Sequence, residues 1–573
     1  MKENKCLFDL FTEKDVELSR RLFLKSCGAS ILLAGIPFNF TQVFAANSHS
    51  DVSNITLTWG LDPKTTQTIA WCTDISVTRG SIQTVKTTKY RKSGWEHVQN
   101  LEAKLELFST NKGDFNIHYA TLEGLKPGVQ YTYRVGSENN WSSESNFTTE
   151  YDDKAFKFLV FGDSQSGLPK NPEYEPWRKT IHNAYAANPD AAFFMMVGDL
   201  VEVGQDQAHW KNWYKAAQDV IEKIPNMAVL GNHETYDVPE ENHSVLPLYF
   251  KKQLHLPNNG PDALKGQVYS FDYGNTHFAV IDSQEQEEGQ YVPNMLALEV
   301  EWLDKDLSAT NKKWKIVLFH KTPYYNKAFR SNEKLKAVLT PIMDKYHVDL
   351  VINGHDHGYS RTYPIYQDSF VSTPDQGTIY LVAGRSGNKY YTDLSDKVWD
   401  AFFHDPQAEP NYIVIEITGD VLTIRAYRQN GGLIDTYSID KLNKIDSPRT
   451  ILPERSNDTR LVIWGNMLQS PLVNVPPQKI SDVWHLPLRS FVEFIGGEVV
   501  AESNGLVVTK YKADEISFTL ESKQSIHNNA TISLAYPLSL TKDTAMIAAD
   551  DVKRLWNFDY RYDEKTNMLM LAK

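Results

Sequence analysis

Short apolar runs alternate with longer amphipathic stretches through the middle of the chain. The apolar runs lie at residues 156–161, 192–197, 227–230, 277–281, 315–319 and 348–352. The amphipathic stretches, at residues 176–187, 209–223, 295–308 and 332–346, have the period of helices. Strands that alternate with helices predict a largely parallel sheet with helices outside it. β-rich runs between residues 377 and 438 would complete a second sheet packed on the first, so residues 155–440 are expected to form one α/β domain.

Residues 51–150 show a different pattern, in which apolar and polar side chains alternate over short runs rich in Thr, Tyr, Trp and β-branched residues. Period-two alternation of this kind predicts an antiparallel β-sandwich. The segment from Leu122 to Tyr133 resembles a corner of fibronectin type III domains, where a loop Leu and a Tyr pack to fix a turn. We expect no chemistry in this domain.

The polar segment 441–460 is expected to be a linker, and residues 461–573 are expected to form a small α+β domain. Residues 480–500 resemble the repeat of the copper amine oxidase N-terminal-like, or stalk, domain, and a weaker copy lies at residues 550–560. The segment has no cluster of metal-ligand residues, so no copper chemistry is expected. The resemblance implies a structural role or attachment to the cell wall or envelope.

Residues 1–46 have the features of an export signal. Ser19-Arg20-Arg21-Leu22-Phe23-Leu24-Lys25 resembles the twin-arginine motif, an apolar run covers residues 31–40, and Val43-Phe44-Ala45 offers a cleavage site. The apolar run is far shorter than the ~20 residues that span a bilayer. We therefore expect export by the twin-arginine route to the periplasm, the cell envelope or the medium, with no transmembrane helix in the mature chain.

Composition restricts the class of function. Of the 573 residues, 41% are hydrophobic and 12% aromatic, which is typical of folded domains with real cores. The formal net charge of -13 and the lack of a Lys/Arg cluster argue against a nucleic-acid partner. The sequence thus predicts a multidomain protein: an all-β sandwich, an α/β domain and a small α+β domain.

Five of the apolar runs in the α/β domain end in side chains that bind metal ions. The motifs are Gly162-Asp163, Gly198-Asp199, Gly231-Asn232-His233-Glu234, Val317-Leu318-Phe319-His320 and Gly354-His355-Asp356-His357. Functional groups in parallel sheets gather at the carboxyl ends of strands. Carboxylate, amide and imidazole ligands without thiolate suit two ions of Fe, Mn or Zn, divalent or of mixed valence. Asp199 is the natural bridge between them.

Two metal ions side by side favour phosphate-ester hydrolysis, because they activate a shared water and neutralise phosphoryl charge. The five motifs, in this order, resemble the signature of calcineurin-like metallophosphoesterases, and the preceding sandwich makes the chain most similar to purple acid phosphatases. The resemblance implies a four-layer αββα domain and a metal-bridging hydroxide that attacks a small-molecule phosphate ester. It places Asp163, Asp199 and His357 on one ion, and Asp199, Asn232, His320 and His355 on the other.

The resemblance also assigns roles around the metals. His233, backed by Glu234, would contact phosphate and protonate the leaving oxygen, and Arg361 would anchor phosphate. Two positions depart from the family: Glu202 stands where purple acid phosphatases carry Tyr, and Gln165 stands where other metallophosphoesterases carry His. Gln165, Glu202 or water could complete the first metal's shell. Because the tyrosinate ligand is missing, we expect a colourless or weakly coloured protein.

Alternatives remain open from the sequence. A metal-binding or degenerate cell-envelope protein could keep the fold without turnover, since the first metal's ligands are altered. Within enzymes, the ligands do not separate an acid-phosphatase-like monoesterase from a phosphodiesterase or nucleotidase.

Overall fold

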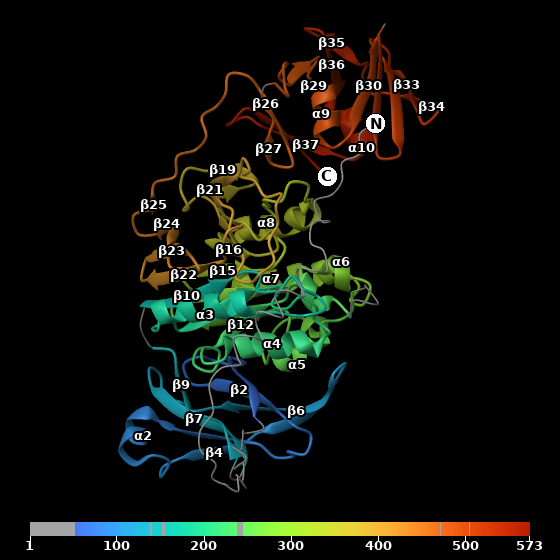
Figure 1. Cartoon of the computed structure of the whole chain (residues 1–573). Coiled ribbons are helices and arrows are strands. Elements are labelled where there is room, and N and C mark those ends of the chain that lie inside the picture. The colour runs from blue at the N-terminus through green and yellow to red at the C-terminus, as the bar shows by residue number, and fades with distance from the viewer. Residues whose placement is uncertain (1–51, 138–139, 152–154, 238–243, 470, 504) are drawn as a thin grey trace, which may run out of the picture. The chain divides into compact units, whose positions relative to one another are not determined.

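The structure is a computed structural model that describes residues 52–573, except residues 138–139, 152–154, 238–243, 470 and 504. The expected export signal, residues 1–46, lies outside the described residues. Among the helices that are described, none is both long and apolar enough to cross a bilayer. Three regions of secondary structure follow one another along the described chain (Figure 1).

The first region is an antiparallel β-sandwich. One sheet has the order β1-β2-β6-β5, and the other has the order β4-β3-β7-β8 with β9 also paired to β7. The strands are β1 (Ser53–Thr58), β2 (Gln67–Thr73), β3 (Ser81–Lys86), β4 (Gln99–Glu102), β5 (Lys104–Thr110), β6 (Gly113–Leu122), β7 (Gln130–Ser137), β8 (Asn140–Trp141) and β9 (Ser145–Thr148). Alternate residues such as Leu57, Ile69 and Val135 form its core, as the period-two pattern predicts. A short helix that the pattern does not predict, α2 (Thr87–Ser93), follows β3.

The turn between β6 and β7 has the predicted packing. Leu125 and Tyr131 are both buried in the sandwich core. The backbone N–H of Lys126 donates a hydrogen bond to the Tyr131 hydroxyl at 2.9 Å. A loop Leu and a Tyr therefore fix this corner.

The second region contains two seven-stranded sheets, with the orders β12-β11-β10-β22-β23-β24-β25 and β13-β14-β15-β16-β20-β17-β21. The six predicted central strands form but divide between the sheets: β10, β11 and β12 are parallel neighbours in the first, and β14, β15 and β16 in the second. Their bounds are β10 (Ala155–Phe161), β11 (Phe193–Val197), β12 (Asn226–Val229), β14 (Thr276–Val280), β15 (Trp314–Leu318) and β16 (Leu350–Asn353). The division follows from β22, which pairs antiparallel with β10 and extends the first sheet on that side.

The other strands of these sheets complete them. They are β13 (Tyr269–Tyr273), β17 (Tyr359–Thr362), β20 (Ile379–Ala383), β21 (Asp400–His404), β22 (Asn411–Thr418), β23 (Val421–Arg428), β24 (Leu433–Asp440) and β25 (Ile445–Ser447). β25 lies inside the segment expected to be a linker and pairs with β24. A small separate hairpin joins β18 (Ile365–Tyr366) to β19 (Ser369–Phe370).

Helices cover both sheets. The helices α3 (Glu175–Ala187) and α4 (Gln207–Ala217) pack on each other, and α3 also contacts β22 of the first sheet. In the same way α7 (Met295–Ala309) packs on α8 (Glu333–Tyr346) and contacts β14 of the second sheet. α4 ends at Ala217, earlier than the predicted residue 223. Shorter helices are η1 (Asn232–Thr235), α5 (Leu248–Gln253), η2 (Asp262–Leu264) and α6 (Glu285–Glu288).

The third region repeats one unit of strand, helix and strand. β29 (Val483–Pro487) leads into α9 (Leu488–Phe494) and β30 (Glu498–Ser503). β36 (Thr544–Ala548) leads in the same order into α10 (Ala549–Trp556) and β37 (Asp559–Asp563). β29 and β36 pair antiparallel, so the two units lie beside each other. The other strands are β26 (Arg460–Ile463), β27 (Asn466–Met467), β28 (Gln478–Ile480), β31 (Leu506–Tyr511), β32 (Asp514–Thr519), β33 (Gln524–His527), β34 (Ala530–Ser533), β35 (Ser539–Thr541) and β38 (Met568–Ala572).

An ion-paired histidine ties the second sheet to helix α7. His277, 6% exposed on β14, places Nδ1 2.8 Å from Asp272 Oδ1 on β13 and Nε2 2.7 Å from Asp306 Oδ2 on α7. Burial alone would lower the pKa of His277, but hydrogen bonds to the two carboxylates outweigh it and raise the pKa to about 9. Because the folded-state pKa is raised, the stabilisation is complete below the ordinary pKa of about 6.5 and is lost as the pH rises through about 9.

We therefore expect the wild type to be more stable than His277→Gln at pH 6, by on the order of 3 kcal/mol. This difference in the free energy of unfolding should shrink steadily between pH 7 and pH 10. Chemical denaturation of both proteins across that range measures it. A difference that stays constant with pH would contradict the charged pairing.

Candidate metal centre

The predicted metal-binding side chains follow five strands, all at their carboxyl ends. The structure places Asp163 after β10, Asp199 after β11, Asn232 after β12, His320 after β15, and His355 and His357 after β16. The first three strands are neighbours in one sheet, and the last two are neighbours in the other. Groups that are far apart in the sequence therefore meet where the two sheets present their carboxyl edges.

These side chains form two groups that share one residue. Asp163, Asp199 and His357 form the first group, and Asp199, His320 and His355 form the second, with the ligand atoms of each group within 4.8 Å of one another. Asp199 Oδ2 lies 3.1 Å from His320 Nε2, and Asp163 Oδ1 lies 3.3 Å from His357 Nε2. Two adjacent metal ions bound to these groups would share Asp199.

The backbone is strained where it presents these groups. Asp163, Asp199, His355 and His357 have φ values of 36°, 51°, 72° and 61°, in the left-handed region. Each such residue costs about 1–2 kcal/mol, and strain of this kind concentrates at functional sites. It turns the side chains back toward one another immediately after the strands end.

Hydrogen bonds fix the tautomers of two imidazoles. His320 Nδ1 donates to the carbonyl of Val197 at 2.7 Å, and His357 Nδ1 donates to the carbonyl of Lys389 at 2.9 Å. Each ring therefore turns Nε2, and not Nδ1, toward the carboxylates, so Nε2 is the nitrogen that would bind a metal ion. Burial, with the charges of Arg330 and His320, holds the pKa of His355 well below its usual range, which keeps this third imidazole neutral.

Three buried polar atoms at the site have no hydrogen-bond partner among the described residues: Asn232 Oδ1, His357 Nε2 and Gln165 Oε1. The amide nitrogen of Asn232 donates to the Tyr236 hydroxyl at 2.7 Å, so its oxygen is the atom left over. An unpaired buried acceptor costs about 1–3 kcal/mol, and a bound cation would satisfy it. The donor set and these acceptors therefore fit a pair of metal ions.

Opposite charges in the second group shift each other's pKa. Burial alone would raise the pKa of Asp199, but nearby His320 and His233 hold it well below its usual range. Burial alone would lower the pKa of His320, but the charge of Asp199 raises it to about 9. The carboxylate that the two groups share is therefore ionised, as a metal ligand would have to be.

Gln165 and Glu202, the two residues that could complete the ligands of the first metal ion, have different partners. Gln165 is fully buried, and its Nε2 donates to Asp199 Oδ2 at 3.1 Å while its oxygen stays free. The Glu202 carboxylate accepts from the backbone N–H of Gly167 at 2.9 Å and pairs with Lys389 Nζ at 3.2 Å. Gln165 is thus the one with an available oxygen, whereas Glu202 serves as a counter-ion.

His233 lies beside the centre, but Glu234 does not support it in the expected way. His233 Nδ1 donates to the backbone carbonyl of Glu202 at 2.7 Å. Glu234 instead accepts backbone N–H groups of Asp199, Val201 and Gly231 at 2.8–3.1 Å. The two residues are adjacent in η1, and their side chains leave it in different directions. Burial, reinforced by the charge of Asp199, raises the pKa of Glu234 to about 8.

Arg361 has partners elsewhere. On β17, its Nε lies 3.0 Å from Asp435 Oδ2, and its guanidinium lies 4.0 Å from the centroid of the Tyr437 ring. The side chain is 4% exposed. Its position four residues past His357 indicated a phosphate anchor, but the strand carries it to a buried ion pair with β24, a contact that local spacing does not reveal.

Lys389 was not predicted and belongs to the site. It follows β20, the neighbour of β16 in the second sheet. Its Nζ lies 2.8 Å from His233 Nε2, and its backbone carbonyl orients His357. The signal available in the sequence was a further apolar run, residues 377–383, that is followed by a loop with two glycines, Gly384 and Gly387.

Comparison with known families agrees with this geometry. Residues 156–359 match the calcineurin-like phosphoesterase family. The central domain is a calcineurin-like phosphoesterase domain. Residues 52–149 match the purple acid phosphatase N-terminal domain, and residues 467–571 match the copper amine oxidase N-terminal domain.

Individual relatives of the phosphoesterase domain are distant. Purple acid phosphatase 21 of Arabidopsis thaliana is 28% identical over 290 residues, 49% of this chain and 60% of that protein. Acid phosphatase type 7 of Mus musculus is 27% identical over 300 residues, 47% of this chain and 64% of that protein. The chain thus spans less than two thirds of these relatives. A purple acid phosphatase structure from yellow lupin seeds shares the fold, with a TM-score of 0.55 and 18% identity over 68% of this chain and 74% of that one.

Gly198 tests how closely this phosphoesterase domain is packed around its ligands. Its φ is +89°, and a Cβ there would lie 2.4 Å from His320 Nδ1 and 2.9 Å from Gly231 Cα. Gly198→Ala should displace the His320 ring and weaken metal binding by roughly 10- to 100-fold. Metal analysis of the reconstituted protein measures this.

Gly419→Ala is the matched control. Gly419 also has a positive φ, +58°, but a Cβ there meets nothing within 4 Å. It carries the backbone strain without the clash, so its metal content should equal that of the wild type. Equal metal content in both variants would disprove the steric argument.

Proposed function

We propose that this protein hydrolyses phosphate esters of small molecules at two metal ions held by the candidate centre. The observation that carries the proposal is the sharing of Asp199 by two ligand groups drawn from four strand ends. The ligands named for the ions are Asp163, Asp199, Asn232, His320, His355 and His357, with Gln165 offering a further oxygen. Oxygen and nitrogen donors without thiolate suit Fe, Mn or Zn.

When bound, two such ions lower the pKa of a shared water and neutralise charge on the phosphoryl group. The chain's own contribution is to hold the ligands in place before substrate arrives. Backbone N–H groups of His233 and His355 hold the carboxylates of Asp199 and Asp163 at 2.9–3.1 Å. Preorganised groups need no rearrangement during the reaction, which is the main source of electrostatic catalysis.

One observation supports the alternative, a protein that binds metal ions but does not hydrolyse esters. Gln165 Nε2 donates to Asp199 Oδ2, the oxygen that also faces His320. If this hydrogen bond persists with metal present, it competes for the bridging oxygen. A protein of this kind would bind metal and hydrolyse nothing. Because two groups of metal-binding side chains share Asp199, we favour the hydrolase.

Hydrolysis of p-nitrophenyl phosphate and bis-p-nitrophenyl phosphate by protein loaded with Mn, Fe or Zn tests the proposal. His320→Ala removes a direct ligand and should lower kcat/KM by roughly 100-fold or more. His182→Ala, on helix α3, should leave kcat/KM unchanged. Two bound ions per chain with no turnover of either ester would favour the alternative instead. The metal-loaded protein should also lack a strong visible absorption band.

We also propose that the chain is exported by the twin-arginine route and acts outside the cytoplasm. The support is the motif around Arg20 and Arg21 followed by a short apolar run. Replacing both arginines with lysine should retain the protein in the cytoplasm, which cell fractionation measures. Unchanged export of that variant would contradict the proposed route.

A further inference from the structure

Lys389 is a cation beside the candidate centre, and its side chain has no role in the proposed function. Its Nζ lies 2.8 Å from His233 Nε2 and 3.2 Å from Glu202 Oε1, and the side chain is 22% exposed. His233 Nε2 in turn lies 4.0 Å from Asp199 Oδ2. One imidazole therefore separates the ammonium group from the shared carboxylate.

The loop that carries Lys389 is fastened to the loop that carries Asp163. Backbone N–H groups of Ser386, Gly387 and Asn388 donate to carbonyls of Gly162, Asp163 and Gln165 at 2.7–3.1 Å. A Cβ on Gly387 would lie 2.3 Å from the carbonyl carbon of Ser164. Such close contact fixes the start of the loop, so the place of Lys389 is set by the same segment that presents the first ligand.

The hydrogen bonds of His233 show which N–H groups on this side can donate toward the centre. Nδ1 faces only an acceptor, the carbonyl of Glu202, so it carries the proton. Nε2 then accepts from the Lys389 ammonium group. The ring thus directs no N–H of its own toward the centre, and the proton donor on this side is Lys389. An ammonium group has three N–H donors, of which His233 and Glu202 take two.

Glu202 explains why a lysine is stable here. Its carboxylate is buried and is held by the backbone N–H of Gly167 and by the ammonium group of Lys389. A buried carboxylate without a cation would be costly. The pair leaves the partly exposed ammonium group positioned beside the ligands, with its carboxylate partner behind it.

We propose that Lys389 binds a non-bridging oxygen of the substrate's phosphate group and makes the centre selective for phosphomonoesters. This inference rests on the proposed function. A monoester carries close to two negative charges over three non-bridging oxygens. A diester carries one charge and replaces one of those oxygens with an ester linkage. A lysine ammonium binds phosphate as a point charge, so it strengthens binding of the monoester more than binding of the diester.

The test compares Lys389→Met, Lys389→Gln and Lys389→Arg with the wild type, all loaded with metal. The Met and Gln variants should lose roughly 10- to 100-fold in kcat/KM for p-nitrophenyl phosphate, the range expected for one charge-assisted hydrogen bond. The loss for bis-p-nitrophenyl phosphate should stay below about 3-fold. Lys389→Arg keeps the charge and should recover most of the monoester activity. Inhibition by inorganic phosphate should weaken in parallel with the monoester loss.

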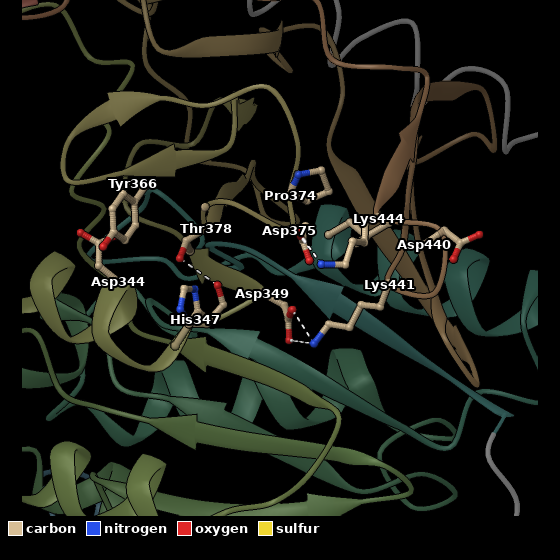
Figure 2. A pocket seen from close by; sticks show the side chains of 13 residues that line it. Asp344, His347, Asp349, Tyr366, Pro374, Asp375, Thr378, Asp440, Lys441 and Lys444 are labelled. Carbon is tan, nitrogen blue, oxygen red and sulfur yellow. Dashed lines mark hydrogen bonds and ion pairs between the residues drawn. The ribbon is translucent and has the colours of Figure 1, made fainter.

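Lys441→Met is the matched control. Lys441 Nζ pairs with Asp349 Oδ1 at 2.7 Å and is 29% exposed, so its exposure and its buried partner resemble those of Lys389. Figure 2 shows this pair in a pocket of about 420 Å³, where Lys444 also pairs with Asp375. Asp349 precedes β16, whereas His355 follows it, so the pocket lies at the other end of that strand. Lys441→Met should leave both activities unchanged.

Three results would overturn the inference: equal loss for both esters, no loss for either, or loss of bound metal in Lys389→Met. The last would mean that the Lys389 side chain holds the metal ligands in place and does not act on the substrate. If the wild type hydrolyses neither ester, the proposed function fails separately. Calorimetry with inorganic phosphate then still decides whether Lys389→Met and Lys389→Gln bind it more weakly than the wild type.

Discussion

The central constraint in this structure is the burial of one ionised carboxylate, that of Asp199. It is 1% exposed, and its charge is balanced by His320 and oriented by the backbone N–H of His233. A buried charge is stable only when its surroundings are arranged around it. Gly231 can approach because it has no side chain, since a Cβ there would lie 2.2 Å from the nitrogen of Asp199. The strand ends, the glycines and the imidazoles all follow from this one requirement.

Packing of the strands and hydrogen bonds to Glu234 hold the strained backbone of the centre in place. The strands supply rigid ends, and their apolar side chains are fully buried in cores on both faces of each sheet. That burial offsets the cost of the left-handed residues at Asp163, Asp199, His355 and His357. Glu234 adds a second support, because it satisfies three backbone N–H groups that the sharp turns leave without strand partners. Glu234 therefore holds the loops in place and does not orient the His233 ring.

Much of the fold and most of the candidate ligands could be predicted because they depend on local pattern. Apolar runs predicted the strands, and metal-binding residue types just after five of these runs predicted the candidate site. Two kinds of information were missing. Pairing between distant strands decided that β22 lies beside β10, and no local signal encodes it. The partners of Arg361 and Glu202 lie 74 and 187 residues away, so only the folded chain shows that one is a buried ion pair and the other a counter-ion.

Glu202, which stands where purple acid phosphatases carry Tyr, affects the charge of the site. A tyrosinate ligand would bring one negative charge to the first metal. Here Glu202 brings a negative charge that Lys389 cancels at 3.2 Å, so the pair adds no net charge to the centre. With less negative protein charge around them, bound cations retain more of their attraction for an anionic substrate. In a chain with a net charge of -13, this local balance would favour the proposed phosphate substrate. Glu202 and Lys389 therefore act as one unit, although 187 residues separate them.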